Sequence, residues 1–269
     1  MMNARRLRGF TLVEMIMVIV ITGIIGGIVA IFIRAPMQGY VDSARRAELT
    51  DIADTALRRV TRDLRLALPN SVRVTGVCGD GTTCYLEFIP TKGGGRYRAG
   101  APGDQLLFTV ADTSFEVLGP MPDMVAGASP DQIVVYNLGI TGADAYAGSN
   151  RTAVSAAPAG AIANITSKKF PFDSPGHRFH VVTSPMSFAC SQSSTNPALG
   201  TLSLVTGYGW GASPATGTPH LLAGNVSACR FTYDPLVVGR TGVVTLHLSI
   251  TEEGETVTLY NAAHVSNQP

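Results

Sequence analysis

The chain has 269 residues, of which 45% are hydrophobic, and its formal net charge is +1. A chain of this length can hold one large domain or two small ones. The near-neutral charge offers no basic footprint for nucleic acid, so we expect no nucleic-acid partner. Glycine and proline are plentiful, and long charged helices are absent after residue 68. Composition therefore favours strands and loops for most of the chain.

Three arginines and a long apolar run mark the beginning of the sequence. The run from Phe10 to Ile33 covers about 24 residues, or roughly 36 Å of helix, enough to cross a hydrocarbon core of about 30 Å. Glu14 is its only charged residue, and Arg34 follows it. Because the tighter basic cluster precedes the run, the N-terminus should stay in the cytoplasm and the remainder of the chain should be exported.

The boundary between the basic residues and the apolar run differs from that of a secretory signal peptide. The two meet at Gly9-Phe10 without a polar spacer, and no Ala-x-Ala site follows the run, so cleavage after the run is not expected. A carboxylate inside a membrane costs about 2.5 to 3.5 kcal/mol at the centre and less near an end, so Glu14 needs a partner. Cleavage between Gly9 and Phe10 would create an ammonium about one helical turn from Glu14, on the same or a neighbouring subunit.

The stretch Arg8-Gly9-Phe10-Thr11-Leu12-Val13-Glu14, followed by an apolar helix, resembles the class III signal sequence of type IV pilins and type II secretion pseudopilins. This resemblance implies cleavage after Gly9 by a prepilin peptidase and N-methylation of Phe10. It also implies that Glu14, the fifth mature residue, docks against a neighbour's N-terminus during assembly. The alternative is an ordinary single-pass anchor with a chance glutamate.

Two further stretches are similar to larger minor pilins. Residues 56–65 resemble the helix of those proteins and of the J-type pseudopilin, and residues 222–231 and 264–269 resemble the tail of a minor pilin of mannose-sensitive haemagglutinin (MSHA) pili. The resemblance implies a minor pilin. Because a large head would crowd a uniform shaft, we expect few copies of it, which prime assembly or lie at the filament tip. Its partners would be a prepilin peptidase, other major and minor pilins and inner-membrane lipid. Its head would be periplasmic at first and extracellular in the filament.

Functions from other classes remain open. A type II secretion pseudopilin shares the N-terminal helix but acts in an export piston. A tip adhesin is compatible with the same assembly role. A membrane-anchored enzyme is the least favoured alternative, since the sequence shows neither a Gly-x-Ser-x-Gly elbow nor a His-Glu-x-x-His motif.

A second helical pattern follows the apolar run. Pro36 should kink or locally break the helix, because proline removes a backbone donor and clashes with the preceding turn. Apolar residues then recur at helical spacing on one face until Pro69-Asn70 ends the helix: Leu49, Ile52, Ala53, Ala56, Leu57, Val60, Leu64 and Leu68. Arginines on the other faces are interleaved with acidic residues, which favours a solvated, ion-paired surface over a nucleic-acid or lipid site.

We expect an α+β fold in which this long N-terminal helix packs on a head of antiparallel β-sheet. The expected parts are a basic leader (1–9), a transmembrane and assembly helix (10–34), its amphipathic continuation (35–68) and a β-rich head (69–269). Apolar and β-branched runs predict strands at residues 72–77, 85–89, 105–110, 114–118, 132–137, 178–183, 187–190, 202–206 and 226–233. Residues 243–251 and 255–262 predict a hairpin around Glu252-Glu253-Gly254.

Loops are expected where alanine, glycine, serine and proline predominate, at residues 143–174, 191–197 and 207–219. Gly93-Gly94-Gly95 lacks the lysine and strand context of a phosphate loop and is interpreted as a hairpin turn. Trp210, the only tryptophan, could anchor a partner if exposed, although packing at the core or its rim is favoured.

Four cysteines in an exported chain favour disulfides and allow three pairings. The favoured pairing joins Cys78 to Cys84, because Gly79-Asp80-Gly81 supplies a tight turn between them, and leaves Cys190 to pair with Cys229. A metal site is the rival, but the cysteine and histidine spacings of zinc sites are missing. His177 and His180 would point to opposite faces of a strand, so they form a poor metal pair. We name no metal ligand and expect no cofactor.

Overall fold

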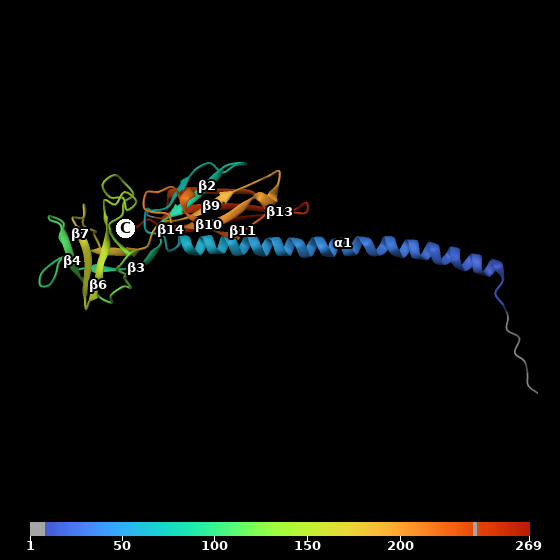
Figure 1. Cartoon of the computed structure of the whole chain (residues 1–269), viewed down its shortest axis with the longest axis horizontal. Coiled ribbons are helices and arrows are strands. Elements are labelled where there is room, and N and C mark those ends of the chain that lie inside the picture. The colour runs from blue at the N-terminus through green and yellow to red at the C-terminus, as the bar shows by residue number, and fades with distance from the viewer. Residues whose placement is uncertain (1–8, 239–240) are drawn as a thin grey trace, which may run out of the picture. The chain divides into compact units, whose positions relative to one another are not determined.

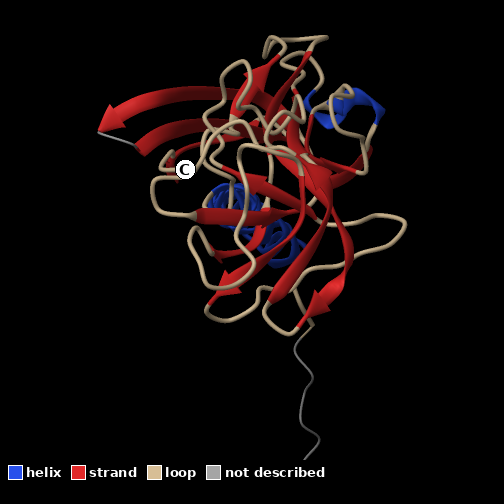
Figure 2. Cartoon of the chain, turned by 90° about the vertical axis from the view of Figure 1, so that its left-hand side faces the viewer, coloured by secondary structure: helices blue, strands red, loops and turns tan. Residues whose placement is uncertain are grey.

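The computed structural model describes residues 9–238 and 241–269 and divides the chain into two compact units between Glu48 and Leu49. Helix α1, Leu12–Leu64, contributes to both units (Figure 1). Its first part, Leu12–Ile33, is long and apolar enough to cross a membrane, and none of that window is buried within the chain. The second unit, Leu49–Pro269, is built mainly from strands, and the chain as a whole has an α+β fold (Figure 2).

Contacts with the strands of the head explain where α1 ends. Beyond Leu64 the chain joins the head: Ala67 forms a β-bridge with Pro90, and the Leu68 N–H donates to the carbonyl of Ile89 at 2.8 Å. The helix therefore stops four residues before the predicted end. It also stays helical through Pro36, so the local break expected there is absent.

Two antiparallel sheets share a core with the apolar face of the second part of α1. The first has five strands in the order β1 (Arg73–Thr75), β2 (Thr83–Phe88), β9 (Met186–Ser191), β10 (Thr201–Thr206) and β11 (Thr218–Ala223). The second has β12 (Val226–Val238), β13 (Thr241–Glu252) and β14 (Glu255–Ser266). Short 3-10 helices, Pro197–Leu199 and Pro214–Thr216, lie in the connections.

The apolar face of α1 forms the core between these sheets. Leu49, Ala53, Val60 and Leu64 are fully buried there, together with Phe188 of β9 and Leu246 of β13 in a single cluster. Burial of these residues is what the helical spacing predicts, but Ile52, which was expected on the same face, is 37% exposed. The predicted hairpin is confirmed as β13 and β14, which turn at Glu253 and Gly254.

A closed six-stranded barrel is inserted between β2 and β9. Its strands follow one another in the order β3 (Thr91–Tyr97), β4 (Asp112–Leu118), β7 (Ile162–Lys168), β6 (Arg151–Ala159), β5 (Gln132–Val135) and β8 (Arg178–Val182). Figure 1 shows β3, β4, β6 and β7 grouped together at the left, apart from β2, β9, β10 and β11. The barrel has its own aromatic core, in which Tyr97, Phe115, Phe170 and Phe179 are buried.

The barrel corrects the prediction of a hairpin turn at the three consecutive glycines. Gly93, Gly94 and Gly95 lie in β3 and not in a hairpin turn. A Cβ on Gly94 would lie 2.8 Å from the carbonyl oxygen of Phe179, and one on Gly95 would lie 2.9 Å from the Phe179 ring. The glycines therefore allow β3 and β8 to approach closely around a buried phenylalanine.

Two predicted loops contain strands, and one predicted strand is irregular. Residues 143–174 include β6 and β7, which pair with each other and with other barrel strands. Residues 207–219 overlap the start of β11. Residues 105–110 form no strand, because their hydrogen bonds are irregular: the Leu106 N–H donates to the carbonyl of Arg98, and the Leu107 N–H donates to the Asp112 carboxylate.

Candidate functional site

The proposed scissile bond lies in open, non-helical chain. Gly9 and Phe10 precede α1 without regular structure, and Phe10 is 79% exposed. A Cβ placed on Gly9 would meet no atom within 4 Å. The peptide bond between these two residues is thus sterically open in the described chain.

Thr11 forms the N-cap of α1. Its hydroxyl accepts a hydrogen bond from the Glu14 N–H at 3.3 Å, and its carbonyl accepts one from the Met15 N–H at 3.2 Å. Capping of this kind satisfies helix donors that would otherwise lack a partner. This role of Thr11 was not among those expected from the sequence, although Thr followed three residues later by Glu is the signature of a capping box.

Glu14 lies in the first turn of α1, exposed, inside the membrane-length apolar segment. Its negative charge is favourable at a helix N-terminus, where the backbone N–H groups point outward. Once Thr11 and the helix dipole fix the first turn, the carboxylate sits about one turn after Phe10. The arrangement can present a carboxylate near a newly formed terminal amine.

The N-terminal residues match a known sequence family. Residues 4–30 fit the model described as the prokaryotic N-terminal methylation motif. The chain therefore carries a type IV pilin-like N-terminus. This points to a structural subunit rather than an enzyme, to a membrane-anchored pilin-like precursor processed by a prepilin peptidase, and to assembly with other pilins. No curated protein matches the chain, and no solved structure does.

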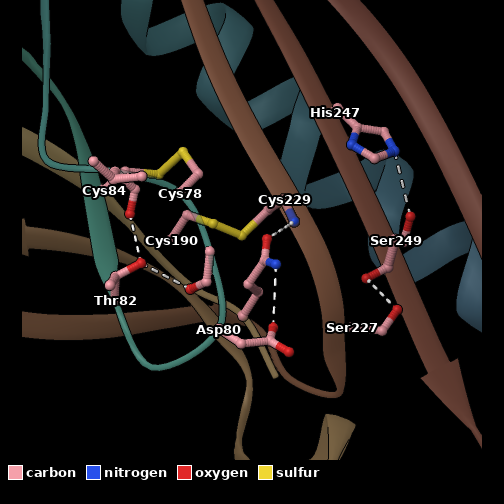
Figure 3. Close-up of a disulfide and its surroundings, with 12 residues drawn as sticks. Cys78, Asp80, Thr82, Cys84, Cys190, Ser227, Cys229, His247 and Ser249 are labelled. Carbon is pink, nitrogen blue, oxygen red and sulfur yellow. Dashed lines mark hydrogen bonds between the residues drawn. A yellow bond between two sulfur atoms is a disulfide. The ribbon is translucent and has the colours of Figure 1, made fainter. Parts of the chain in front are cut away.

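The four cysteines of the β-rich unit form two disulfides, which pair Cys78 with Cys84 and Cys190 with Cys229 (Figure 3). These are the pairs that the sequence analysis favoured. The first closes a short turn before β2. The second joins β9 to β12, and so links the five-stranded sheet to the three-stranded sheet. Since all four sulfurs are bonded in pairs, they offer no thiolate to a metal ion.

Polar contacts tie the two disulfides together. Asp80, in the turn closed by the first disulfide, accepts hydrogen bonds from the Ser194 N–H at 3.1 Å and from the Gln192 side chain at 3.2 Å. The side-chain oxygen Oε1 of Gln192 accepts a hydrogen bond from the N–H of Cys229 at 3.0 Å. The pKa of Asp80 is lowered chiefly by a hydrogen bond from the Ser194 hydroxyl, and further by those from the Gln192 side chain and the Ser194 N–H. Nothing in the sequence around Gln192 signals this bridging position.

The two histidines considered as a metal pair differ in their position and surroundings. His180 lies in β8, while His177 precedes that strand. Burial, with a smaller effect of Arg178, lowers the pKa of His180 to about 4.

The arginines of α1 form ion pairs with acidic residues of the same helix. Arg58 pairs with Asp54 at 2.5 Å, and Arg59 and Arg62 lie within 3.7 Å of Asp63. The expected ion-paired face is therefore present on this helix.

Trp210 is half-buried and packs beside a small core cluster, which agrees with the favoured prediction of packing at the rim of the core. The guanidinium of Arg151 lies over its ring. This tryptophan therefore helps to connect the barrel with the five-stranded sheet, and its ring is not left open to a partner.

Proposed function

We propose that this chain is a minor pilin, a structural and assembly subunit of a type IV pilus such as the MSHA pilus, and that it is MshO-like. The leader, residues 1–9, is removed between Gly9 and Phe10, and Phe10 is N-methylated. Residues 10–34 form the transmembrane and assembly helix, which continues as far as Leu64. Residues 69–269 form the β-rich head. The N-terminus is cytoplasmic and the head periplasmic until the subunit enters an extracellular filament.

The observation that carries this proposal is the N-terminal methylation motif on an unburied apolar helix whose only charge is Glu14. When apolar helices associate side by side in lipid, their packing does little to fix the axial position of one helix relative to the next. A carboxylate that needs an amine at one depth supplies the register. Glu14 would thus pair with the methylated amine of Phe10 on a neighbouring subunit.

The head supports a role at low copy number. It contains a barrel inserted beside two packed sheets, and such a large head would crowd a uniform filament shaft. We therefore place the subunit at the tip, where it would prime polymerisation.

Mass spectrometry of the mature chain tests the processing step, since the proposal requires a chain that begins with methylated Phe10. A mature chain that keeps its leader would refute it. Immuno-gold labelling of isolated pili tests the placement: gold confined to filament ends supports the tip role, and gold spread evenly along the shaft contradicts it.

A type II secretion pseudopilin is the second candidate, favoured by the resemblance of residues 56–65 to the J-type pseudopilin. Deletion of the gene distinguishes the two, because a pilus subunit affects piliation and a pseudopilin affects protein secretion. A tip adhesin would instead show normal piliation with lost surface binding.

A further inference from the structure

Cys84 and Cys190 face each other across two neighbouring strands but are bonded to other partners. They are register partners in the antiparallel pair β2 and β9, while Cys84 is joined to Cys78 and Cys190 to Cys229. The sulfurs of Cys78, Cys84 and Cys190 all lie within 4.8 Å of one another. The two disulfides are thus close enough to exchange partners after a small movement of side chains.

Access to these sulfurs is unequal. Cys84 and Cys190 are completely buried and Cys229 is 2% exposed, whereas Cys78 is only partly buried. A groove of about 450 Å³ opens beside them and is bordered by Cys78, Cys229, Gln192, Arg230, His247 and Tyr260. A small thiol entering this groove reaches the sulfur of Cys78 more easily than any other. Thiol–disulfide exchange depends on such access.

We propose that the two disulfides form a thiol–disulfide relay in which reducing equivalents enter at Cys78 and pass to the buried Cys190–Cys229 bond through Cys84. This inference is independent of the proposed function. A monothiol such as glutathione, as its thiolate, attacks the Cys78 sulfur, forms a mixed disulfide there and releases the Cys84 thiolate. The Cys84 thiolate then attacks the Cys190 sulfur, forms a Cys84–Cys190 disulfide and releases the Cys229 thiolate, which takes up a proton.

A second glutathione thiolate completes the reaction. It attacks the glutathione sulfur of the mixed disulfide on Cys78, giving oxidised glutathione and the Cys78 thiolate, which is then protonated. In total, two glutathione molecules lose two electrons, and the protein exchanges two disulfides for one disulfide and two thiols. The bond between β9 and β12 is replaced by a bond between β2 and β9, so the two sheets lose their covalent link while the five-stranded sheet gains one.

The fold favours Cys84 as the attacking group. When the accessible Cys78 sulfur is attacked, the buried Cys84 is the group that leaves. Its strand holds it opposite Cys190 in the register of β2 and β9. The hydrogen bonds from Gln192 to Asp80 and from the Cys229 N–H to Gln192 keep both disulfides beside each other.

Partial reduction of the full-length chain in detergent micelles tests the relay. The oxidised protein is treated with glutathione, quenched with acid at intervals and alkylated, and its disulfide-linked peptides are identified by mass spectrometry. The expected intermediate contains a Cys84–Cys190 linkage with Cys78 and Cys229 alkylated. A Cys78–Cys190 linkage in its place, or loss of both native disulfides without any new linkage, would overturn the proposal.

Two serine variants provide the matched controls. In Cys78→Ser/Cys84→Ser, the Cys190–Cys229 bond has lost its entry point and should be reduced about tenfold more slowly than in the wild type. In Cys190→Ser/Cys229→Ser, the Cys78–Cys84 bond should be reduced at the wild-type rate. Unfolding in guanidinium should abolish the tenfold difference. Equal rates of Cys190–Cys229 reduction in the folded wild type and the first variant would refute the relay.

Discussion

The guanidinium carbon of Arg151 lies 4.0 Å from the centroid of the Trp210 ring, and this contact joins the barrel to the loop that follows β10. Arg151 also donates from Nε to the carbonyl of Ala145 at 2.7 Å and from Nη1 to the side chain of Gln132 at 3.1 Å. In the same loop, Tyr208 bonds Ser187 of β9 at 2.5 Å. One short segment thus contacts both the barrel and the five-stranded sheet.

Replacing Arg151 with lysine should weaken this junction. Lysine keeps the charge but loses the planar fork that stacks on Trp210 while donating in two directions. We expect the free energy of unfolding to fall by about 1 to 3 kcal/mol. Urea unfolding of the detergent-solubilised chain, followed by the fluorescence of Trp210, measures the change. Arg65, an exposed residue directly after α1, offers a control, since Arg65→Lys should change stability by less than about 0.5 kcal/mol. Equal effects of the two substitutions would contradict this role of Arg151.

Alanine at Gly95 should destabilise the barrel. Its Cβ would lie 2.9 Å from the Phe179 ring and 3.3 Å from Val117, and Phe179 is fixed in the barrel core at 1% exposure. Overpacking of this kind costs about 1 to 3 kcal/mol. Thermal unfolding monitored by circular dichroism would report the loss.

The matched control is Gly100→Ala, because a Cβ at Gly100 meets no atom within 4 Å. We expect this second variant to be neutral or slightly more stable, since alanine reduces the freedom of the unfolded chain. If Gly95→Ala proved as stable as Gly100→Ala, the close packing of β3 on Phe179 would be wrong.

His180 should make the stability of the head depend on pH. Burial lowers its pKa from 6.5 to about 4 in the folded chain. Between these values the unfolded chain binds the proton and the folded chain does not, so stability rises with pH. The contribution is fully present above about pH 6.5 and is lost as the pH falls toward 4.

The loss should amount to about 1 to 3 kcal/mol. Urea unfolding at pH 7.5 and at pH 4.5, compared between wild type and His180→Gln, isolates this effect from that of the carboxylates, which both proteins share. The wild type should lose more stability than the variant on acidification. The same loss in both would show that His180 does not contribute.

Sequence patterns predicted the parts of the fold that local rules control. Leu49, Ala53, Val60 and Leu64 recur at helical spacing, and the structure buries all four. Polar and apolar residues alternate around Leu246 and Leu248, and a Glu-Gly turn follows them. This local pattern predicted the final hairpin. At the N-terminus, the basic cluster, apolar run and Glu14 are recognisable without any tertiary contact.

The barrel could not be predicted in this way, because its strands depend on partners far away in the sequence. Gly93 to Gly95 have no side chains to signal a strand, and their role is apparent only once Phe179 is seen against them. The alanine-rich β6 likewise lacks a clear alternation and is defined by pairing with β5 and β7. The position of Cys84 opposite Cys190 follows from register, which no spacing of cysteines reveals.

Glutamine at Glu14 should prevent incorporation into filaments while leaving the head folded. The amide is nearly isosteric but carries no charge, so it cannot neutralise the terminal amine of a neighbouring Phe10 in lipid. We expect the amount of subunit in sheared filaments to fall on the order of tenfold or more. Immunoblots of sheared and membrane fractions measure it, and mass spectrometry of the membrane fraction shows whether the leader has been removed.

Glu48 provides the control for this substitution. It is an exposed acid of the same helix, but it lies outside Leu12–Ile33. Glu48→Gln should therefore enter filaments like the wild type. Processed Glu14→Gln subunits that remain in the membrane would show that the carboxylate acts after cleavage, in assembly. Wild-type incorporation of Glu14→Gln would instead mean that packing of apolar helices alone determines register, and the proposed pairing with Phe10 would have to be abandoned.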